Sequence, residues 1–490
     1  MMNPRFVKRV AVGIIFSFLL FFLVSAKSHA ATTLMSYRNQ KISWNNCSDG
    51  FQCGTFRVPV DYSHITADHF TLRVIRRPTS NTLRIGTLIV NPGGPGASAM
   101  EYAAAATSIV SKAIYEKFDI LGFDERGVGQ SEPIRCLTDR EEDAMLGGDG
   151  TVNSTSQLAA VIASAKSFAA SCAKAAGSRL GHYSTLESAK DMELLRIILG
   201  EKSLYFLGKS YGTYLGTIYA ALYPKSVGRM VLDGAMDPQE SVRNQALYQA
   251  KGFEIALDAY LKANRDFTKQ TIDNFLAKLR KRPMAAGKGR FLTESFAITG
   301  IASALYDNST GWPDLATALN EVIKRNNPSP LLALSDNYYQ RDSNGRYTNN
   351  QNDIAEIISC LDFVDNRSAE TMYADRANFA KVAPTFGPYL AFSSLVCEYW
   401  RAKPQVLSNY SALASSPPVL IIGVTRDPAT PYRWAESLHA DFSRSTLLTY
   451  DGDGHTGHNR GNACIDSTVD AYLLTGALPK GGSGKKKCSA

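Results

Sequence analysis

The chain has 490 residues, of which 44% are hydrophobic and 20% are charged, a composition typical of a globular protein with one large domain or two. Its net charge is +8, but residues 1–30 carry four positive side chains and no acidic ones, which leaves +4 for the rest. Lys480, Lys485, Lys486 and Lys487 account for that remainder, so the body is close to neutral. This argues against nucleic acid as a partner, and we expect the lysine-rich end to be a solvated tail.

Residues 1–30 have the pattern of a signal peptide. Arg5, Lys8 and Arg9 precede an apolar run over 11–26, and Ser28 and Ala30 place small residues where a signal peptidase cleaves. The run is short for a membrane span. We therefore predict an exported protein, periplasmic or secreted, with no stable membrane association after cleavage; an uncleaved anchor is the alternative.

All eight cysteines follow this segment. An even number in an exported chain indicates disulfides, and no pair has the spacing of a zinc site. We expect four disulfides and no metal. The sequence leaves the connectivity open, but neighbours along the chain suggest the pairs Cys47–Cys53, Cys136–Cys172, Cys360–Cys397 and Cys464–Cys488.

Apolar runs that end in glycine-rich turns alternate with helical patterns as far as residue 234. This alternation predicts parallel strands joined by crossover helices. The strand-like runs cover 71–77, 83–94, 118–127, 203–208 and 227–234, and the helical patterns include 188–200 and 211–224.

Helical patterns dominate from 235 to 416, where strand-like runs vanish, and the strand pattern returns at 419–424 and 445–450 around a helix at 431–442. We predict an α/β fold with a mostly parallel sheet flanked by helices. Residues 31–234 and 417–490 form its core domain, and 235–416 form a helical lid inserted between late strands.

Ser210 lies in Gly-Lys-Ser-Tyr-Gly (208–212), between a predicted strand and a predicted helix. This context is typical of a nucleophile elbow, a tight turn that raises a serine hydroxyl above the sheet edge. The backbone N–H of Tyr211 is then placed to stabilise an oxyanion. The alternative is a turn serine that caps the helix.

A serine hydroxyl needs a base to take its proton, and on this fold the acid and then the histidine follow the serine. His64, His69 and His182 precede Ser210, and His439 falls in an amphipathic helix. We therefore choose His455 in Asp-Gly-Asp-Gly-His-Thr-Gly-His. His458 is the alternative base. A further alternative is that both histidines are metal ligands.

The acid should follow the preceding strand, where Asp427 lies in Thr-Arg-Asp-Pro. Its role is to orient the imidazole and stabilise the imidazolium. A helix cap ahead of Pro431 is the structural alternative, and Asp233 is a competing acid. The loop Asn-Pro-Gly-Gly-Pro-Gly (91–96) offers Gly94, or a neighbour, as the second oxyanion donor, unless it is only a structural turn.

Taken together, "NPGGPGAS", "GFDERGVGQSEP", "GKSYGTYLGTIYA" with "VLDGAMDP", and "TRDPATP" with "DGDGHT" resemble the tripeptidyl aminopeptidase family of secreted α/β-hydrolases, which is related to proline iminopeptidases. The resemblance implies Ser210 as nucleophile, Asp427 as acid and His455 as base. It also implies a lid over the site and cleavage of short peptides from a free amino terminus. The chain departs from the family at Glu125, where proline is common, and at Ala97 and Ala99, where glycine is common.

An aminopeptidase needs carboxylates to receive the substrate's ammonium group. Asp362 and Glu398, each near a cysteine of the predicted lid, are the candidates, although both could be structural acids. The expected partner is a short peptide or a protein amino terminus, and no cofactor is expected.

The leading hypothesis is an exported serine exopeptidase. The alternative is a carboxylic ester hydrolase acting on small apolar esters, and a third hypothesis is a catalytically silent binding protein. The sequence leaves open the number of residues released, the side-chain preference and the oligomeric state.

Overall fold

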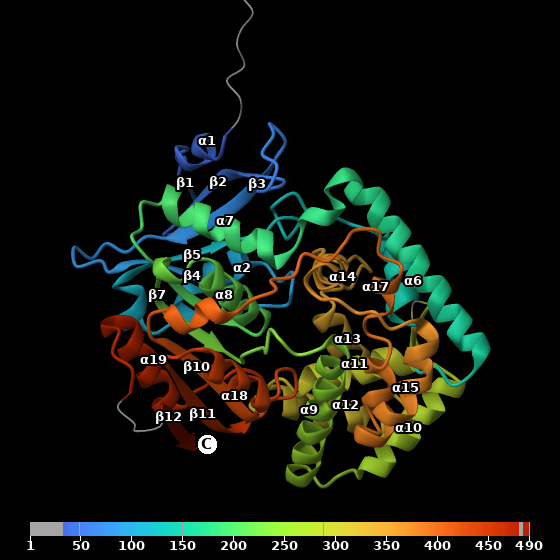
Figure 1. Cartoon of the computed structure of the whole chain (residues 1–490). Coiled ribbons are helices and arrows are strands. Elements are labelled where there is room, and N and C mark those ends of the chain that lie inside the picture. The colour runs from blue at the N-terminus through green and yellow to red at the C-terminus, as the bar shows by residue number, and fades with distance from the viewer. Residues whose placement is uncertain (1–32, 49, 149, 288, 480–483, 490) are drawn as a thin grey trace, which may run out of the picture.

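A sheet of ten strands, counted over the described residues, runs through the molecule in the order β1-β2-β3-β5-β4-β6-β7-β10-β11-β12 (Figure 1). The structure is a computed structural model that describes residues 33–48, 50–148, 150–287, 289–479 and 484–489; the predicted signal peptide lies outside these ranges. The strands are β1 (Asn45–Ser48), β2 (Phe51–Pro59), β3 (His69–Arg77), β4 (Gly86–Asn91), β5 (Phe118–Phe123), β6 (Leu204–Lys209), β7 (Val227–Asp233), β10 (Val419–Arg426), β11 (Ser445–Asp453) and β12 (Lys485–Ser489).

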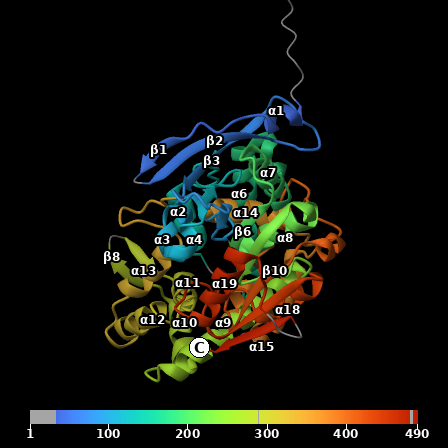
Figure 2. The ribbon, with the colours of Figure 1, turned by 90° about the vertical axis from the view of Figure 1, so that its left-hand side faces the viewer.

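From β5 to β12 every pair of neighbouring strands is parallel, whereas β1, β2 and β3 join the sheet antiparallel at one edge. Figure 2 shows these three strands along the top of the molecule. The fold class predicted from the sequence is confirmed: the protein is a mostly parallel α/β-hydrolase sheet flanked by helices.

Both faces of the central strands are covered, which explains their continuous apolar sequences. Side chains alternate between the two faces: Ile89 and Phe206 pack on one face, and Leu88 and Leu207 on the other. The first face is covered by α7 (Thr185–Ile198), α8 (Tyr211–Leu222) and α18 (Tyr432–Asp441), and the second by α2 (Ala99–Ala104), α3 (Ala106–Ile109), α4 (Lys112–Tyr115) and α19 (Ala463–Thr475). A short helix, α1 (Leu34–Arg38), precedes the sheet.

Between β7 and β10 the chain forms a set of helices with a hydrophobic core of its own, built around Phe253, Leu257, Ile301 and Leu319. These inserted helices lie beside the sheet in Figure 1. They are α9 (Val242–Ala263), α10 (Lys269–Lys281), α11 (Glu294–Ala304), α12 (Gly311–Leu319), α13 (Ser329–Tyr338), α14 (Gln351–Asp362), α15 (Ala369–Val382), α16 (Gly387–Leu390) and α17 (Leu395–Glu398). Contrary to the expectation that strands vanish here, β8 (Met284–Gly287) and β9 (Arg290–Leu292) form a small antiparallel hairpin.

Two helices that precede β6, α5 (Asp139–Leu146) and α6 (Thr155–Ala176), extend toward the inserted helices. Leu158 and Ala165 of α6 cluster with Met372 and Leu395 of α15 and α17, and α6 runs along this side in Figure 1. Within the described ranges, the segment 155–182 is the one helical stretch long and apolar enough to cross a membrane. Cys172, in this stretch, is buried and bonded to Cys136.

The structure contains four disulfides, and they join the neighbours that the sequence suggested: Cys47–Cys53, Cys136–Cys172, Cys360–Cys397 and Cys464–Cys488.

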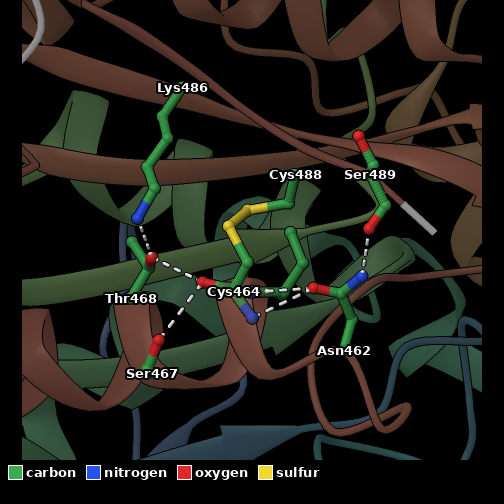
Figure 3. Close-up of a disulfide and its surroundings, with 8 residues drawn as sticks. Asn462, Cys464, Ser467, Thr468, Lys486, Cys488 and Ser489 are labelled. Carbon is green, nitrogen blue, oxygen red and sulfur yellow. Dashed lines mark hydrogen bonds between the residues drawn. A yellow bond between two sulfur atoms is a disulfide. The ribbon is translucent and has the colours of Figure 1, made fainter.

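The lysine-rich C-terminal end corrects one expectation, because it is the edge strand β12 and no solvated tail. Cys488 is buried and bonded to Cys464 of α19 (Figure 3). Lys486 donates to the hydroxyl of Thr468 at 2.7 Å, and Asn462 donates to the carbonyl of Ser489 at 2.7 Å. The exposed lysines alternate with less exposed residues, as on edge strands that use charge to avoid pairing with other chains.

Candidate active site

Ser210 stands at the turn between β6 and α8 with φ 54° and ψ −125°, a backbone conformation that is costly for any residue with a side chain. Its N–H donates to the carbonyl of Asp233 at 2.9 Å. Its side chain makes no capping hydrogen bond to α8, whereas Ser184, at the same position of α7, accepts from the N–H of Glu187. The geometry is therefore that of a raised nucleophile, and the hydroxyl is not used as a helix cap.

The glycines on either side of Ser210 are required by close packing. A Cβ at Gly208 would collide with the carbonyl of Gly212, and a Cβ at Gly212 would lie 2.7 Å from Oδ1 of Asn91. The turn can therefore be this tight only with glycine at both positions, which accounts for the spacing of the motif.

The glycine loop after β4 packs directly against this turn. Gly93 has φ 97°, and a Cβ there would lie 2.9 Å from Cβ of Ser210 and 3.0 Å from the backbone nitrogen of Tyr211. The N–H of Gly93 is already donated to Oδ1 of Asn91 at 2.9 Å. Gly94 lines the same cavity as Ser210 and Tyr211, so both residues predicted to donate to the oxyanion border this cavity.

His455 and Asp427 are brought together at the carboxyl ends of β11 and β10. Nδ1 of His455 lies 2.9 and 3.0 Å from the two carboxylate oxygens of Asp427. The carboxylate is 2% exposed and also accepts the N–H groups of Ala429, Thr430 and Thr456 at 2.9, 2.8 and 3.2 Å. Asp427 thus stabilises the turn that follows it and also orients the imidazole. Nε2 of His455 is the ring nitrogen that remains to accept a proton.

The end of β7 connects the imidazole with the serine turn. Asp233 accepts the N–H of Ser210, and a Cβ at the next residue, Gly234, would lie 3.3 Å from Cε1 of His455. The imidazole of His455 and the turn that carries Ser210 therefore contact two consecutive residues, Asp233 and Gly234.

Asp233 and His458, the competing acid and base, have other contacts. The carboxylate of Asp233 accepts the N–H groups of Gly457 and His458 at 2.7 and 3.0 Å, and Nζ of Lys209 lies 3.7 Å away. His458 is 2% exposed, and burial together with the nearby Lys209 lowers its pKa to about 3. Asp233 therefore braces the loop that carries His455, and His458 is a neutral core residue.

Among the described residues, the cluster of metal-binding side chains close enough to hold an ion is Asp61, His182 and Glu187, which contains neither His455 nor His458. Glu187 is already paired with Lys190 at 2.5 Å and lies 3.5 Å from Arg126, two cations that would repel an ion.

Ser210 opens into a cavity of about 620 Å³ between the sheet and the inserted helices. Among the residues that the structure describes, two acids contribute to its lining, Asp362 and Asp365. Asp365 is neutralised by Arg367, at 3.0 and 2.7 Å, and accepts from the hydroxyl of Ser394. The wall also includes several aromatic side chains, among them Phe253, Tyr306, Tyr339, Phe386, Tyr389 and Trp434.

Asp362 is 2% exposed and accepts the N–H of Thr185 at 2.7 Å and the hydroxyl of the same residue. Over the described residues, its hydrogen bonds and ion pairs include no basic side chain, and burial raises its pKa to about 7. Glu398, the second predicted acid, is not among the lining residues; it is exposed and accepts the N–H of Ala369 at the start of α15 at 2.7 Å. The structure brings Asp362 to the cavity of Ser210 and leaves Glu398 outside it.

Sequence reasoning missed the contact of Tyr306 with His455. The ring of Tyr306 packs edge-on against the imidazole, with centroids 5.1 Å apart, and its carbonyl accepts the N–H of His455 at 2.8 Å. No local motif marks Tyr306, which lies 149 positions before His455.

Comparison with known proteins identifies relatives of this chain. Residues 383–487 match the family model described as TAP-like protein. The chain is 33% identical to "Serine protease Hip1" of Mycobacterium tuberculosis, over 91% of each chain. It is 31% identical to "Tripeptidyl aminopeptidase" of Streptomyces lividans, over 89% of this chain and 84% of that protein. It is 34% identical to "Carboxylesterase B" of M. tuberculosis, over 89% and 88%.

Solved structures that it resembles include esterase E22, with a TM-score of 0.40, 16% identity and coverage of 86% of this chain and 100% of that one. The proline iminopeptidase of Mycobacterium smegmatis gives 0.36 and 14%, over 86% and 97%. From the curated relatives, each more than 30% identical over most of both chains, it follows that the chain is a serine hydrolase that belongs to the tripeptidyl aminopeptidase family of α/β-hydrolases.

Proposed function

We propose that this enzyme is an exported serine aminopeptidase that releases short peptides, of tripeptidyl length, from free amino termini. The observation that carries the proposal is that Ser210 and the buried carboxyl of Asp362, which has no basic partner among the described residues, line one cavity. A relative named tripeptidyl aminopeptidase supports it.

In this mechanism Nε2 of His455 takes the proton of the Ser210 hydroxyl as the oxygen attacks the scissile carbonyl. Asp427, bound to Nδ1, fixes the tautomer and stabilises the imidazolium. The N–H groups of Tyr211 and Gly94 receive the oxyanion. His455 then protonates the leaving amine, and water, activated by the same imidazole, hydrolyses the acyl-enzyme.

Asp362 receives the substrate's ammonium group. A carboxyl buried without a cation is costly to ionise, and an ammonium that enters the cavity supplies the missing charge and three donors. A cavity of about 620 Å³ is of the size that encloses a small ligand. The inserted helices act as a lid, so the enzyme accepts a short amino-terminal segment in preference to an internal one.

The test is a panel of one-, two- and three-residue peptide arylamides, each with a free or an acetylated amino terminus. We expect the free three-residue substrate to have the highest kcat/KM. Asp362→Asn should lower kcat/KM on free substrates about 10- to 100-fold, the usual effect of losing a hydrogen bond between charged groups, with little change on acetylated ones. Glu398→Gln is the matched control and should change neither; equal losses on both substrate forms in Asp362→Asn reject the role.

The second candidate function is a carboxylic ester hydrolase, favoured by the apolar and aromatic side chains in the cavity wall and by a relative named carboxylesterase B. Ester turnover alone does not decide, because a serine acyl-transfer site cleaves activated esters readily. A kcat/KM on simple apolar esters that exceeds every peptide arylamide would favour this function. Labelling of Ser210 by a fluorophosphonate separates both enzymes from a silent binding protein.

Export is supported by the pattern of residues 1–30 and by the four disulfides. The mass of the mature protein tests it: the expected amino terminus is Ala31, and an intact residue 1 in membrane fractions would indicate the uncleaved anchor.

A further inference from the structure

A buried chain of polar groups runs from the loop after β5 to the wall of the cavity. It links Glu125, Tyr211, Thr185 and Asp362, which come from the β5 loop, the first residue of α8, the first residue of α7 and the last residue of α14. The hydroxyl of Tyr211 lies 3.4 Å from Oε2 of Glu125 and is hydrogen-bonded to the hydroxyl of Thr185. Thr185 is in turn hydrogen-bonded to Asp362 through its hydroxyl and its N–H. Two carboxyls are thereby joined through two hydroxyl groups.

Glu125 also braces the oxyanion loop. Its Oε1 accepts from the side-chain amide of Asn91 at 2.7 Å, and the carbonyl oxygen of that amide accepts the N–H of Gly93 at 2.9 Å. Gly93 packs against Ser210. Glu125 therefore sets the orientation of an amide that fixes the loop next to the nucleophile.

The charged groups around these hydrogen-bonded residues, as far as the structure describes them, form no ion pair with the carboxyls of Glu125 and Asp362. Asp124 accepts from Ser98, Met100 and Gln130, and Arg126 is committed to Asp191 at 2.7 Å and to Glu187. In the described part of the chain, the other titratable groups near Asp362 are two tyrosines. The hydroxyl of Tyr214 lies 3.4 Å from the backbone carbonyl oxygen of Asp362, and Tyr410 is close enough to interact with the carboxylate electrostatically. Over the described residues, neither Glu125 nor Asp362 is hydrogen-bonded to a basic side chain.

The raised pKa values of Glu125 and Asp362 are consistent with carboxyls that are buried without a basic partner. Burial raises the pKa of Glu125 to about 7, with a smaller contribution from Asp124 and Asp191. Burial raises the pKa of Asp362 to about 7 as well, and Glu125 adds to the effect. Two interacting acids of this kind titrate as a pair.

We propose that Glu125 and Asp362 share one proton across Tyr211 and Thr185, and that Glu125 is a positioning residue that accepts the proton of Asp362 when a cationic group enters the cavity. The transfer is balanced: the proton of Asp362 passes to the Thr185 oxygen, the Thr185 proton to the Tyr211 oxygen, and the Tyr211 proton to Glu125. Both hydroxyls end as they began, and one negative charge moves from Glu125 to Asp362, where the ammonium pairs with it. This inference rests on the proposed function, which identifies the cation as the ammonium group of a peptide substrate.

The experiment measures KM against pH for a free-amino tripeptide arylamide and kcat for a neutral aryl ester. Glu125→Gln keeps an acceptor for Asn91 but cannot take the proton or become charged. We expect the fall of 1/KM at acid pH to move down by about one pH unit, because the negative charge that Glu125 carries while Asp362 holds the shared proton is absent in this variant. Thr185→Val removes a hydroxyl that stabilises the carboxylate of Asp362, and the fall of 1/KM at acid pH should therefore move to a higher pH.

Two further variants separate positioning from general damage. Glu125→Ala removes the brace on Asn91 and should lower kcat on the ester about 10-fold, while Glu125→Gln retains most of that kcat. Thr217→Val is the control, because Thr217 is a buried threonine of α8 whose hydroxyl, over the described residues, donates to the carbonyl of Thr213 alone. This variant should leave the pH dependence of 1/KM unchanged.

A fall of 1/KM at acid pH that stays in place in both Glu125→Gln and Thr185→Val, or that moves equally in Thr217→Val, overturns the shared proton. A wild-type enzyme that does not distinguish free from acetylated substrates contradicts the proposed function instead. The ester measurement still decides the positioning role in that case, since an unchanged kcat in Glu125→Ala overturns it.

Discussion

Arg460 is hydrogen-bonded to Tyr306 across the boundary between the sheet and the inserted helices. Its Nη1 donates to the carbonyl of Tyr306 at 3.2 Å and to the carbonyl of His455 at 3.1 Å. Its Nη2 donates to Asp307 and Asn308 at 3.1 and 2.9 Å. One guanidinium group therefore ties the loop that follows α11 to the loop of the proposed base.

Arg460→Met should lower kcat/KM about 10- to 100-fold, because hydrogen bonds to a charged donor are worth about 1.5–3 kcal/mol each and their loss frees the imidazole loop. The loss should fall mainly on kcat, and steady-state kinetics on one arylamide measures it. Arg433→Met is the control, since Arg433 is 53% exposed with its nearest acid 4.0 Å away. A fall confined to KM would place Arg460 in substrate binding and not in positioning.

Asp427→Asn should lower kcat about 1,000- to 10,000-fold with little change in KM, because an amide favours the wrong imidazole tautomer. Asp233→Asn should cost far less activity and more stability, since that carboxylate accepts two loop N–H groups and does not contact the imidazole nitrogens. The two variants are compared by kcat and by melting temperature. A larger kcat loss in Asp233→Asn would reverse the assignment of the acid.

Replacing Cys136 and Cys172 together by serine should lower the free energy of unfolding by about 2–4 kcal/mol, because the bond closes a loop with a sequence separation of 36. The Cys47–Cys53 bond spans 6 residues, and the same change there should cost about 2 kcal/mol or less. Urea unfolding of the two double variants gives the comparison. Equal losses would show that loop entropy does not set the difference.

His458 should make the folded protein sensitive to acid. Its pKa is lowered to about 3 in the fold and returns to about 6.5 on unfolding, so the unfolded chain binds the extra proton between these values. The stability contributed by a neutral His458 is complete above pH 6.5 and is lost as the pH falls toward 3, by up to about 1.4 kcal/mol per pH unit. His458→Gln should flatten this slope in urea unfolding between pH 7 and 4, and an unchanged slope would contradict the assignment.

The residues that the sequence located are those fixed by local rules. Ser210 is marked by glycines that the turn requires, and Asp427 and His455 each follow a strand whose carboxyl end meets the same edge of a parallel sheet. Asp362 and Glu398 were both chosen for their places near cysteines of the insertion; of the two, the structure brings Asp362 to the cavity of Ser210, and its role in substrate binding stays a prediction.

The residues that the sequence did not locate depend on contacts between distant segments. Thr185 meets Asp362 across 177 positions, and no pattern near either residue records that contact. The strand β12 was mistaken for a tail because three consecutive lysines resemble a solvated segment, whereas the disulfide to Cys464 and the pairing with β11 hold it in the sheet.

The order of the disulfides has a consequence for how the chain matures. The eight cysteines are bonded in four consecutive pairs along the sequence, over separations of 6, 36, 37 and 24 residues. In the proposed export, a polypeptide that crosses a translocation pore with its amino terminus leading therefore presents both partners of one bond before the first cysteine of the following bond emerges. Oxidation in order of arrival yields the native set, and no wrongly joined pair has to be exchanged by an isomerase.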